Sequence, residues 1–244
     1  MLHIYSKEIN SFLNSLIGYI VISVFLTVLG LLVWIFPETS VLDYGYADLE
    51  TLFSFSPYIF IFLVPAITMR MFAEEQKSGT LELILTKPVS GMSVIIGKFL
   101  SGLTLVIVAL LPTGVYYYSM HSLGNPAGNI DSAEVMGSYL GLILLGGVFV
   151  SFGIFASSIT RNQIVAFILG VFFCFVMYQG FSSISLMPGL EGNSLLIEQL
   201  GISYHYSSIS KGLIDSRDAV YFLTVIIIMI GSTNLVLKSK QWGS

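Results

Sequence analysis

The distribution of charged residues constrains this chain more than any other feature. Its ten Lys and Arg residues and fourteen Asp and Glu residues all fall outside six long stretches. These uncharged stretches are residues 9–37, 51–69, 99–130, 135–160, 162–190 and 219–237. One helix needs roughly 20 apolar residues to cross a bilayer core about 30 Å thick. The pattern therefore predicts an all-α integral membrane protein with six transmembrane helices.

The composition excludes several other classes of protein. The chain is 55% hydrophobic and only 10% charged, whereas a soluble globular protein is about 25% charged. The net charge of −4 and the lack of a basic cluster argue against a nucleic-acid partner, since phosphate binding requires one. The lone Cys174 can form no disulfide within the chain.

Apolar runs and helix-breaking residues together predict where each span begins and ends within a single transmembrane domain, residues 1–244. Before the first span, apolar residues recur at helical spacing over residues 1–15, which favours an amphipathic helix on the cytoplasmic surface. The alternative is a frayed leader that feeds the first span. The spans are expected near residues 16–36, 54–72, 96–118, 137–159, 163–185 and 219–236.

Positive charges near the spans predict the orientation, because Lys and Arg are retained in the cytoplasm. With both termini inside, eight of the ten Lys and Arg residues are cytoplasmic, and only Lys211 and Arg217 lie outside. The reverse topology would invert that ratio. Both termini are therefore expected in the cytoplasm.

The segment 186–218, on the predicted periplasmic side, is longer than an ordinary connection and carries its own apolar residues. We expect one or two short helices here that dip back toward the outer leaflet as a re-entrant segment, packed on protein. Asp215 as N-cap, with Asp218 three residues on, would begin the last span.

The loop 73–93, between the second and third predicted spans, holds the most distinctive pattern. Residues 74–78 are polar and predict a helix that Gly79 ends. Thr80 can cap a second short helix that stops at Pro88. Such a helix, held at the membrane surface, is suited to docking into a groove on a soluble partner. The alternative is a helical hairpin that packs on its own protein. The apolar side of the second helix consists of Leu81, Ile84 and Leu85.

A long gapless motif runs through this loop: Glu-x-x-x-Gly-Thr-Leu-Glu-Leu-x-Leu-Thr-x-Pro-Val, followed by Gly-Lys. It resembles the signature between the second and third spans of ABC-2 type ABC transporter permeases. That resemblance implies an ABC-2, type V exporter-like permease fold, in which this segment forms the coupling helix that contacts the ATP-binding subunit. The matching positions are Glu75, Gly79, Thr80, Leu81, Glu82, Leu83, Leu85, Pro88, Val89, Gly97 and Lys98.

Other segments extend the resemblance to nearly the whole chain, among them residues 161–163, 210–215 and 221–222. Residues 7–20 and the tail from 204 to 222 are most similar to the gliding-motility-associated ABC transporter permease of Bacteroidetes. This likeness implies a place in a bacterial inner membrane and a cytoplasmic ABC ATPase as partner. It also implies either a second permease copy or a paralogous membrane subunit with a large periplasmic region.

The sequence lacks a nucleotide-binding loop of its own. Gly91 precedes Gly97-Lys98 by one residue too many, and Phe99 replaces the Ser or Thr that would bind magnesium. ATP and magnesium are therefore expected on the partner ATPase, with no cofactor on this chain and no enzymatic activity of its own. The three His residues are isolated from one another and from the lone Cys, so no metal site is expected.

No predicted span carries a carboxylate or a Lys near its centre. Such groups mark proton and ion pathways, so their lack argues against a proton-coupled secondary carrier. That carrier remains one alternative. A non-transporting membrane anchor that uses ATPase motion to work on periplasmic machinery is another.

Small residues gather in the fourth and fifth predicted spans and allow helices to approach closely. They fit packing within one subunit or a dedicated subunit interface. Pro65 and Pro112 predict kinks in the second and third spans.

We therefore expect a permease subunit that dimerises and couples ATP hydrolysis by a separate subunit to transport or mechanical work, in gliding motility by resemblance. Glu75 and Glu82 would be its polar docking contacts, and Leu81, Leu83 and Leu85 the apolar ones. The substrate and the direction of transport are not readable from the residues. The residues predicted to couple to the ATPase are Glu74, Glu75, Gly79, Thr80, Leu81, Glu82, Leu83, Leu85, Pro88, Gly97 and Lys98.

Overall fold

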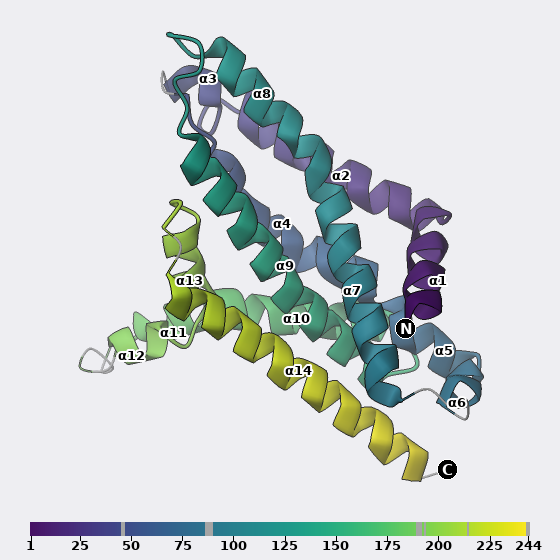
Figure 1. The fold of residues 1–244 in the computed structure, drawn as a ribbon. Coiled ribbons are helices and arrows are strands. Elements are labelled where there is room, and N and C mark those ends of the chain that lie inside the picture. Colours follow the sequence, from purple (N-terminus) through teal and green to yellow (C-terminus); the bar gives the residue numbers. More distant parts are fainter. Residues whose placement is uncertain (45–46, 86–89, 189–191, 193, 214, 243–244) are drawn as a thin grey trace.

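The structure is a computed structural model that describes residues 1–44, 47–85, 90–188, 192, 194–213 and 215–242. Its described residues form helices and their connections, with no strand among them, which confirms the predicted all-α fold (Figure 1). The α-helices are α1 (Leu2–Leu13), α2 (Leu16–Trp34), α3 (Val41–Tyr44), α4 (Glu50–Thr68), α5 (Arg70–Lys77), α6 (Thr80–Leu85), α7 (Gly91–Leu110), α8 (Gly114–Leu123), α9 (Ser132–Ile159), α10 (Gln163–Phe175), α11 (Phe181–Ser185), α12 (Ser194–Glu198), α13 (Ile202–Ile209) and α14 (Ser216–Trp242). A 3₁₀ turn, η1 (Leu111–Thr113), joins α7 to α8, and a π-helical turn, η2 (Val176–Gly180), joins α10 to α11.

Six helical segments of the described chain are long and apolar enough to cross a membrane. They are Leu16–Trp34, Glu50–Lys77, Gly91–Leu123, Ser132–Ile159, Gln163–Ser185 and Ser216–Lys240. Both termini lie at the same end of the bundle as α5 and α6, as an even number of crossings requires (Figure 1).

Four of these segments are longer than the sequence predicts, and one of them, α9, begins at Ser132 and not near 137, because the Asp131 carboxylate caps it. The second continues past the predicted end at 72, because α5 packs against α9 and stays buried there. The third begins at Gly91 and not near 96, because Ser90 caps the helix by accepting a hydrogen bond from the N–H of Ser93 at 3.3 Å. The last begins at Ser216 and continues to Trp242, beyond the predicted 236, so polar residues extend it at both ends.

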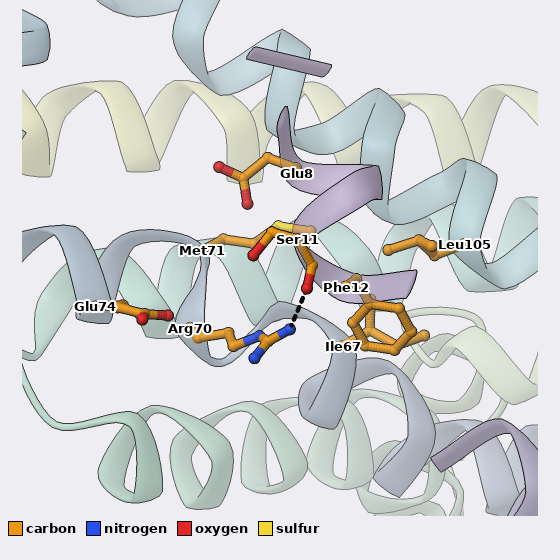
Figure 2. A pocket seen from close by; sticks show the side chains of 8 residues that line it. All are labelled: Glu8, Ser11, Phe12, Ile67, Arg70, Met71, Glu74 and Leu105. Carbon is orange, nitrogen blue, oxygen red and sulfur yellow. Dashed lines mark hydrogen bonds between the residues drawn. The ribbon is translucent and has the colours of Figure 1, made fainter. Parts of the chain in front are cut away.

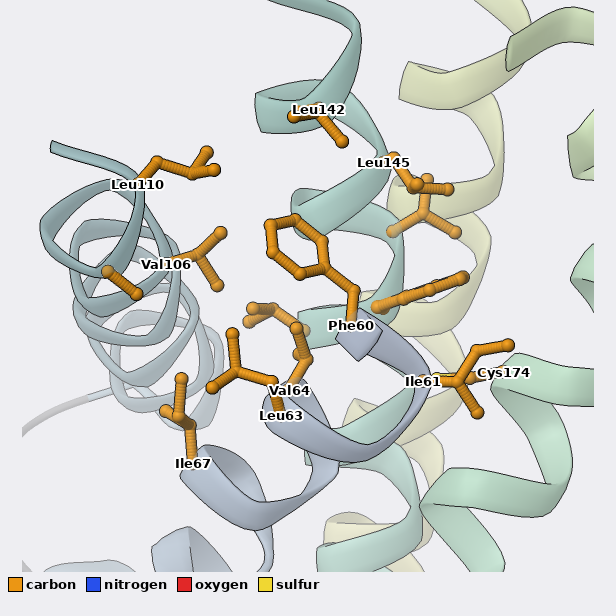
Figure 3. Packing of buried hydrophobic residues seen from close by; sticks show 14 of the residues in the cluster. Phe60, Ile61, Leu63, Val64, Ile67, Val106, Leu110, Leu142, Leu145 and Cys174 are labelled. Atoms are coloured by element: carbon orange, nitrogen blue, oxygen red, sulfur yellow. The ribbon is translucent and has the colours of Figure 1, made fainter. Parts of the chain in front are cut away.

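The central helix is α9, which contacts α4, α7, α10, α13 and α14. Of its apolar window, 78% is buried inside the protein, against 22% for α2, α10–α11 and α14, which therefore lie outermost. Figure 3 shows Phe60 and Val64 of α4 packed among Val106 of α7 and Leu142 and Leu145 of α9. These interlocking side chains hold the inner spans together by close packing, the main attraction between helices in lipid.

Glycines on α9 make this packing possible. A Cβ at Gly153 would lie 1.9 Å from Thr68 Oγ1, and one at Gly146 would lie 2.7 Å from Val106 Cγ1. On α10, a Cβ at Gly170 would lie 3.0 Å from Pro65 Cβ. These glycines therefore serve packing within one subunit, the first of the two interpretations of the small residues.

In segment 186–218, the described residues 186–188, 192, 194–213 and 215–218 include two short helices, α12 and α13, before the last span. The Asp215 carboxylate accepts a hydrogen bond from the N–H of Arg217 at 2.9 Å, the geometry of an N-cap. We had expected Asp218 to contribute to this cap, but its carboxylate makes a different contact. Its Oδ1 lies 2.7 Å from Nδ1 of His205, which ties α13 to α14. The His205 ring stacks on Tyr221 at 3.9 Å between ring centroids.

Candidate functional site

The motif that follows the second span folds as two helices joined at a corner. In α5, Met71, Phe72, Ala73 and Glu75 are buried. At the corner, Gly79 has φ +69°, a left-handed conformation that glycine adopts without the strain a side chain would add. The chain then turns into α6, and Glu74, Ser78, Thr80 and Glu82 are exposed around the corner. The corner therefore presents a polar surface, while α5 has one face in the core.

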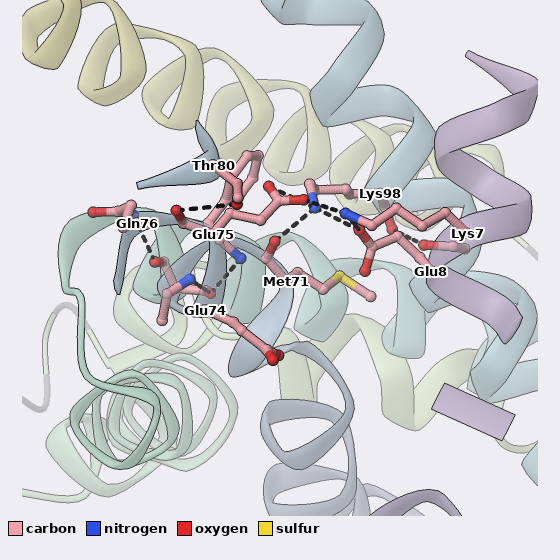
Figure 4. Close-up of polar contacts among 12 residues, drawn as sticks. Lys7, Glu8, Met71, Glu74, Glu75, Gln76, Thr80 and Lys98 are labelled. Atoms are coloured by element: carbon pink, nitrogen blue, oxygen red, sulfur yellow. Dashed lines mark hydrogen bonds and ion pairs between the residues drawn. The ribbon is translucent and has the colours of Figure 1, made fainter. Parts of the chain in front are cut away.

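Four charged side chains from three helices meet beside α5 (Figure 4). We call Lys7 and Glu8 of α1, Glu75 of α5 and Lys98 of α7 the four-charge cluster. Lys98 has no exposed surface, and its Nζ donates to Glu8 Oε1 and to the carbonyl oxygen of Met71, both at 2.6 Å. The same Nζ lies 3.1 Å from Glu75 Oε2, an ion pair without hydrogen-bond geometry. Lys7 Nζ donates to Glu75 Oε1 at 2.7 Å.

The two lysines and two glutamates neutralise one another, which explains how Lys98 can be fully buried. A buried charge without a partner costs several kcal/mol, so each of these charges requires its neighbours. The ring of Phe72 adds a cation–π contact, with its centroid 4.9 Å from Lys98 Nζ. Burial alone would lower the pKa of Lys7, but the hydrogen bond to Glu75 and the charges of Glu75 and Glu8 raise that pKa above its ordinary value.

The N-terminal helix α1 is fastened to the rest of the site at two further points. Arg70 donates from Nη2 to the carbonyl oxygen of Ser11 at 3.1 Å (Figure 2). The same Nη2 donates to Ser15 Oγ at 2.9 Å. Beside this contact lies a cavity of about 20 Å³, lined by Glu8 and Arg70 among others, with room for about one water molecule. At the other end of α1, Ile4 Cγ2 would lie only 3.4 Å from a Cβ on Gly97. Gly97 therefore lets α1 approach α7 next to Lys98.

On its opposite side, α5 is anchored to the end of α9. The hydroxyl of Ser157 accepts hydrogen bonds from the N–H of Phe72 at 2.9 Å and of Ala73 at 3.0 Å, and donates to the carbonyl oxygen of Met69 at 2.9 Å. The first N–H groups of a helix have no partner within that helix, so Ser157 caps α5 from another helix. Gln76 adds hydrogen bonds to the carbonyl oxygens of Ser157 and Ser158.

The structure divides the residues predicted to contact an ATPase into two groups. Glu75 and Lys98 come together with Gly97 in the interior, and Leu81 is also buried, at 6% exposure. Glu75 and Leu81 are turned toward the protein by α5 and α6, so neither side chain lies on the exposed surface of the corner. The exposed members are Glu74, Gly79, Thr80 and Glu82. Leu83 and Leu85 belong to α6, but their side chains, like Pro88 and Val89 altogether, lie outside the described residues.

Sequence reasoning missed three residues of this site: Lys7, Glu8 and Ser157. The signal available for the first two was a pair of opposite charges inside the amphipathic segment, matched by the opposite charges at Glu75 and Lys98. No local signal distinguishes Ser157 from the other serines of the fourth span. Among the described residues, no group of three His, Cys, Asp or Glu side chains is arranged to hold a metal ion.

A comparison with protein families identifies the chain. The model of the ABC-2 family transporter protein matches residues 2–237, nearly its whole length. The chain belongs to the ABC-2 transporter family. A search of curated proteins found no significant match. As an ABC-2 permease it is a multi-pass membrane subunit, distinct from the ATPase of its transporter, and the family implies an ABC ATPase as partner.

Family membership and the structure together describe where the motif lies in the permease. The corner between α5 and α6 belongs to an ABC-2 permease, and it is the polar projection that follows the second of its six apolar segments. The four-charge cluster attaches this projection to α1 and α7, and Ser157 attaches it to α9. A displacement of α5 would therefore act on three other helices of the permease.

Proposed function

We propose that this permease subunit couples ATP hydrolysis by a separate ATPase to transport or mechanical work, and that the corner α5–α6 is where it receives the force. One observation carries the proposal. The exposed corner stands on a helix whose other faces are bonded to α1, α7 and α9 by the four-charge cluster and by Ser157. Such a helix cannot move alone, because its displacement must break these buried contacts or carry its neighbours with it.

Different residues have different parts in this mechanism. Glu74 and Glu82, both exposed, are the polar contacts to the ATPase, with Leu83 and Leu85 as the apolar ones. Gly79 sets the angle of the corner, as Pro88 is expected to set the end of α6. Glu75 and Lys98 position the corner from inside, next to Gly97, and so transmit force without touching the partner.

The proposed contact is tested by Leu83→Asp. A carboxylate in an apolar docking surface is unfavourable, so the variant should insert into the membrane but lose co-purification of the ATPase. The matched control is Leu195→Asp, the same change at an exposed position of α12, outside the α5–α6 corner. It should keep the ATPase. Undiminished co-purification with Leu83→Asp would remove α6 from the docking surface.

We also propose that α5, α6 and both termini face the cytoplasm of a bacterial inner membrane. Support comes from the excess of Lys and Arg on that side. Cys174 is buried and has no exposed surface, so a single cysteine introduced at Thr80 can be labelled against a low background. An impermeant maleimide should label Thr80→Cys in inside-out vesicles but not in whole cells. Cysteine at Leu200, next to α13, should give the opposite result, and labelling of position 80 in whole cells would overturn the topology.

A dimer, with a second copy or with a paralogous membrane subunit that has a large periplasmic region, completes the proposed transporter. The role in gliding motility rests on the resemblance of residues 7–20 and 204–222. Deletion of the chain should abolish gliding, and affinity purification should recover the ATPase and the second membrane subunit. Normal gliding after deletion would show that the chain has no role in motility. The ATPase partnership is tested separately, by whether the purification recovers the ATPase.

A further inference from the structure

The last helix, α14, is bonded to other elements of the protein at both of its ends. It runs from Ser216, beside α13, to Trp242, at the end of the bundle that holds α5 and α6 (Figure 1). At 1.5 Å per residue, its 27 residues extend for about 40 Å. A single helix therefore connects the α5–α6 corner with the segment before the last span, at the opposite end of the bundle.

Lys240 attaches the inner end of α14 to two other helices. Its Nζ donates hydrogen bonds to the carbonyl oxygens of Ser158 at 2.7 Å and Ile159 at 3.2 Å. These are among the last carbonyl groups of α9, which have no partner within that helix, and the helix dipole also favours a cation there. The same Nζ donates to Oε1 of Gln76, whose Nε2 donates to the carbonyl oxygen of Ser158 at 3.0 Å. Helices α5, α9 and α14 therefore meet at one ammonium group.

The outer end of α14 is bonded to α13 and to the connection that precedes α13. Asp218 Oδ1 lies 2.7 Å from Nδ1 of His205, whose Nε2 lies 2.9 Å from the carbonyl oxygen of Gln199. Three residues further along α14, the hydroxyl of Tyr221 donates to the carbonyl oxygen of Leu200 at 2.6 Å. Asp218 is only 7% exposed, so a separation of α14 from His205 would leave a buried carboxylate without its partner.

Between its two ends, α14 is held less firmly. Only 22% of its apolar window is buried, against 78% of that of α9. Lipid chains are as apolar as the side chains that they contact, so an exchange of protein for lipid along this helix costs little. The polar contacts at its ends therefore decide which neighbouring elements α14 follows when one of them moves.

Helix α4 is a second connection between the corner and α13. It leads directly into α5, and near its start the carbonyl oxygen of Phe53 accepts a hydrogen bond from the hydroxyl of Tyr206 at 2.7 Å. However, α4 contains Pro57 and Pro65, and a proline removes a backbone hydrogen bond and allows a helix to bend. The sequence of α14 contains no proline, so this helix transmits an axial displacement with less bending.

From these contacts we infer that α14 is a mechanical link that carries a displacement of the α5–α6 corner to residues 199–209 at the opposite end of the bundle. Lys240, Asp218 and His205 are its positioning residues. The inference rests on the proposed function for the source of the force, the ATPase, but not for the coupling between the two ends of α14. A displacement at the outer end acts on the corner by the same path, because coupling between two sites is reciprocal.

The first test requires no ATPase. Hydrogen exchange, which reports local opening, is measured on the purified full chain and on Lys240→Met. Lys240 is exposed, so its replacement should leave the fold intact. Exchange of residues 199–209, at the far end of α14, should increase about threefold or more. Lys240→Arg, which keeps the charge, should retain most of the protection.

The matched control is Lys238→Met, which removes an exposed cation two residues earlier on α14 and should leave exchange of residues 199–209 unchanged. In the reverse direction, Asp218→Asn should increase exchange in α5. The inference is overturned by an increase confined to the surroundings of position 240, by equal increases in Lys240→Met and Lys238→Met, or by unchanged exchange of α5 in Asp218→Asn.

The second test uses the complex with the ATPase. The rate at which a maleimide labels Leu200→Cys should change when ATP is added, and this change should be lost when Lys240→Met is also present. Lys240→Met should still co-purify with the ATPase, because α6 is untouched. Loss of the ATPase in this variant would place Lys240 in the docking contact and overturn its positioning role. If the ATPase fails to co-purify with the wild-type chain, the proposed function is wrong, whereas the coupling along α14 is still decided by hydrogen exchange.

Discussion

The four-charge cluster makes a quantitative prediction for Lys98→Met. Methionine is similar in length to lysine but uncharged, so the variant removes the cation that lies 2.6 Å from Glu8 and 3.1 Å from Glu75. Lys7 remains, but its side chain is 58% exposed and lies 3.9 Å from Glu8. Glu8, only 12% exposed, then loses its nearest cation, and the carbonyl oxygen of Met71 loses a donor. Removal of one partner from a buried ion pair lowers the free energy of unfolding by about 3–5 kcal/mol.

A second variant separates lost charge balance from lost packing. Lys98→Met combined with Glu8→Gln removes one charge of each sign and leaves the pair between Lys7 and Glu75. The double variant should recover about 1–3 kcal/mol of the loss, because neighbouring members of one network are not additive. Lys7→Met alone should cost less than about 1 kcal/mol, since its side chain is mostly exposed.

The measurement is the free energy of unfolding in mixed micelles, from denaturant titration followed by circular dichroism. A Lys98→Met protein within about 1 kcal/mol of the wild type would refute the reasoning. If the double variant loses more free energy of unfolding than the two single variants lose together, the argument from charge balance is refuted, but not the predicted cost of Lys98→Met.

Two further predictions concern packing and pH. Gly153→Ala should lower the free energy of unfolding by about 1–3 kcal/mol, because its Cβ would overlap Thr68. Gly231→Ala, with open space around it, should be neutral or slightly stabilising. Thermal unfolding of the two variants tests this, and equal melting temperatures would contradict it. The pKa of Lys7 is raised in the folded protein, so its contact with Glu75 stabilises the fold fully below the ordinary lysine pKa of 10.5. This stabilisation is lost as the pH rises through the higher pKa of the folded state. Hydrogen exchange of α1 should increase in that pH range, and the increase should disappear in Glu75→Gln.

The motif shows how far local pattern reasoning extends. The polar run, the break at Gly79 and the short second helix were all readable, because each depends on a few adjacent residues. The direction in which Glu75 points was not readable. It is decided by Lys98 and by Glu8, and the latter is 90 residues from Lys98 along the chain. A motif carries the residue types needed at a site but not which face of the helix turns inward.

The same limit applies to helix ends. The predicted second span stopped near 72, where the sequence becomes polar, but the helical segment continues to Lys77. Its continuation depends on Ser157, which supplies hydrogen-bond acceptors to α5 from the end of another span. A cap donated by a distant helix leaves no mark in the local sequence.

Membrane class, the number of apolar segments and their approximate positions followed from the amino-acid order alone. Each depends on whether a window of about 20 residues is more stable in lipid than in water, which is a property of that window. Tertiary contacts decided how α1 is attached, why Lys98 can be fully buried, and which face of α5 remains open to a partner. A charged side chain at a helix end can be exposed to water or buried inside the protein. It is buried only where opposite charges from other helices lie close enough to pair with it.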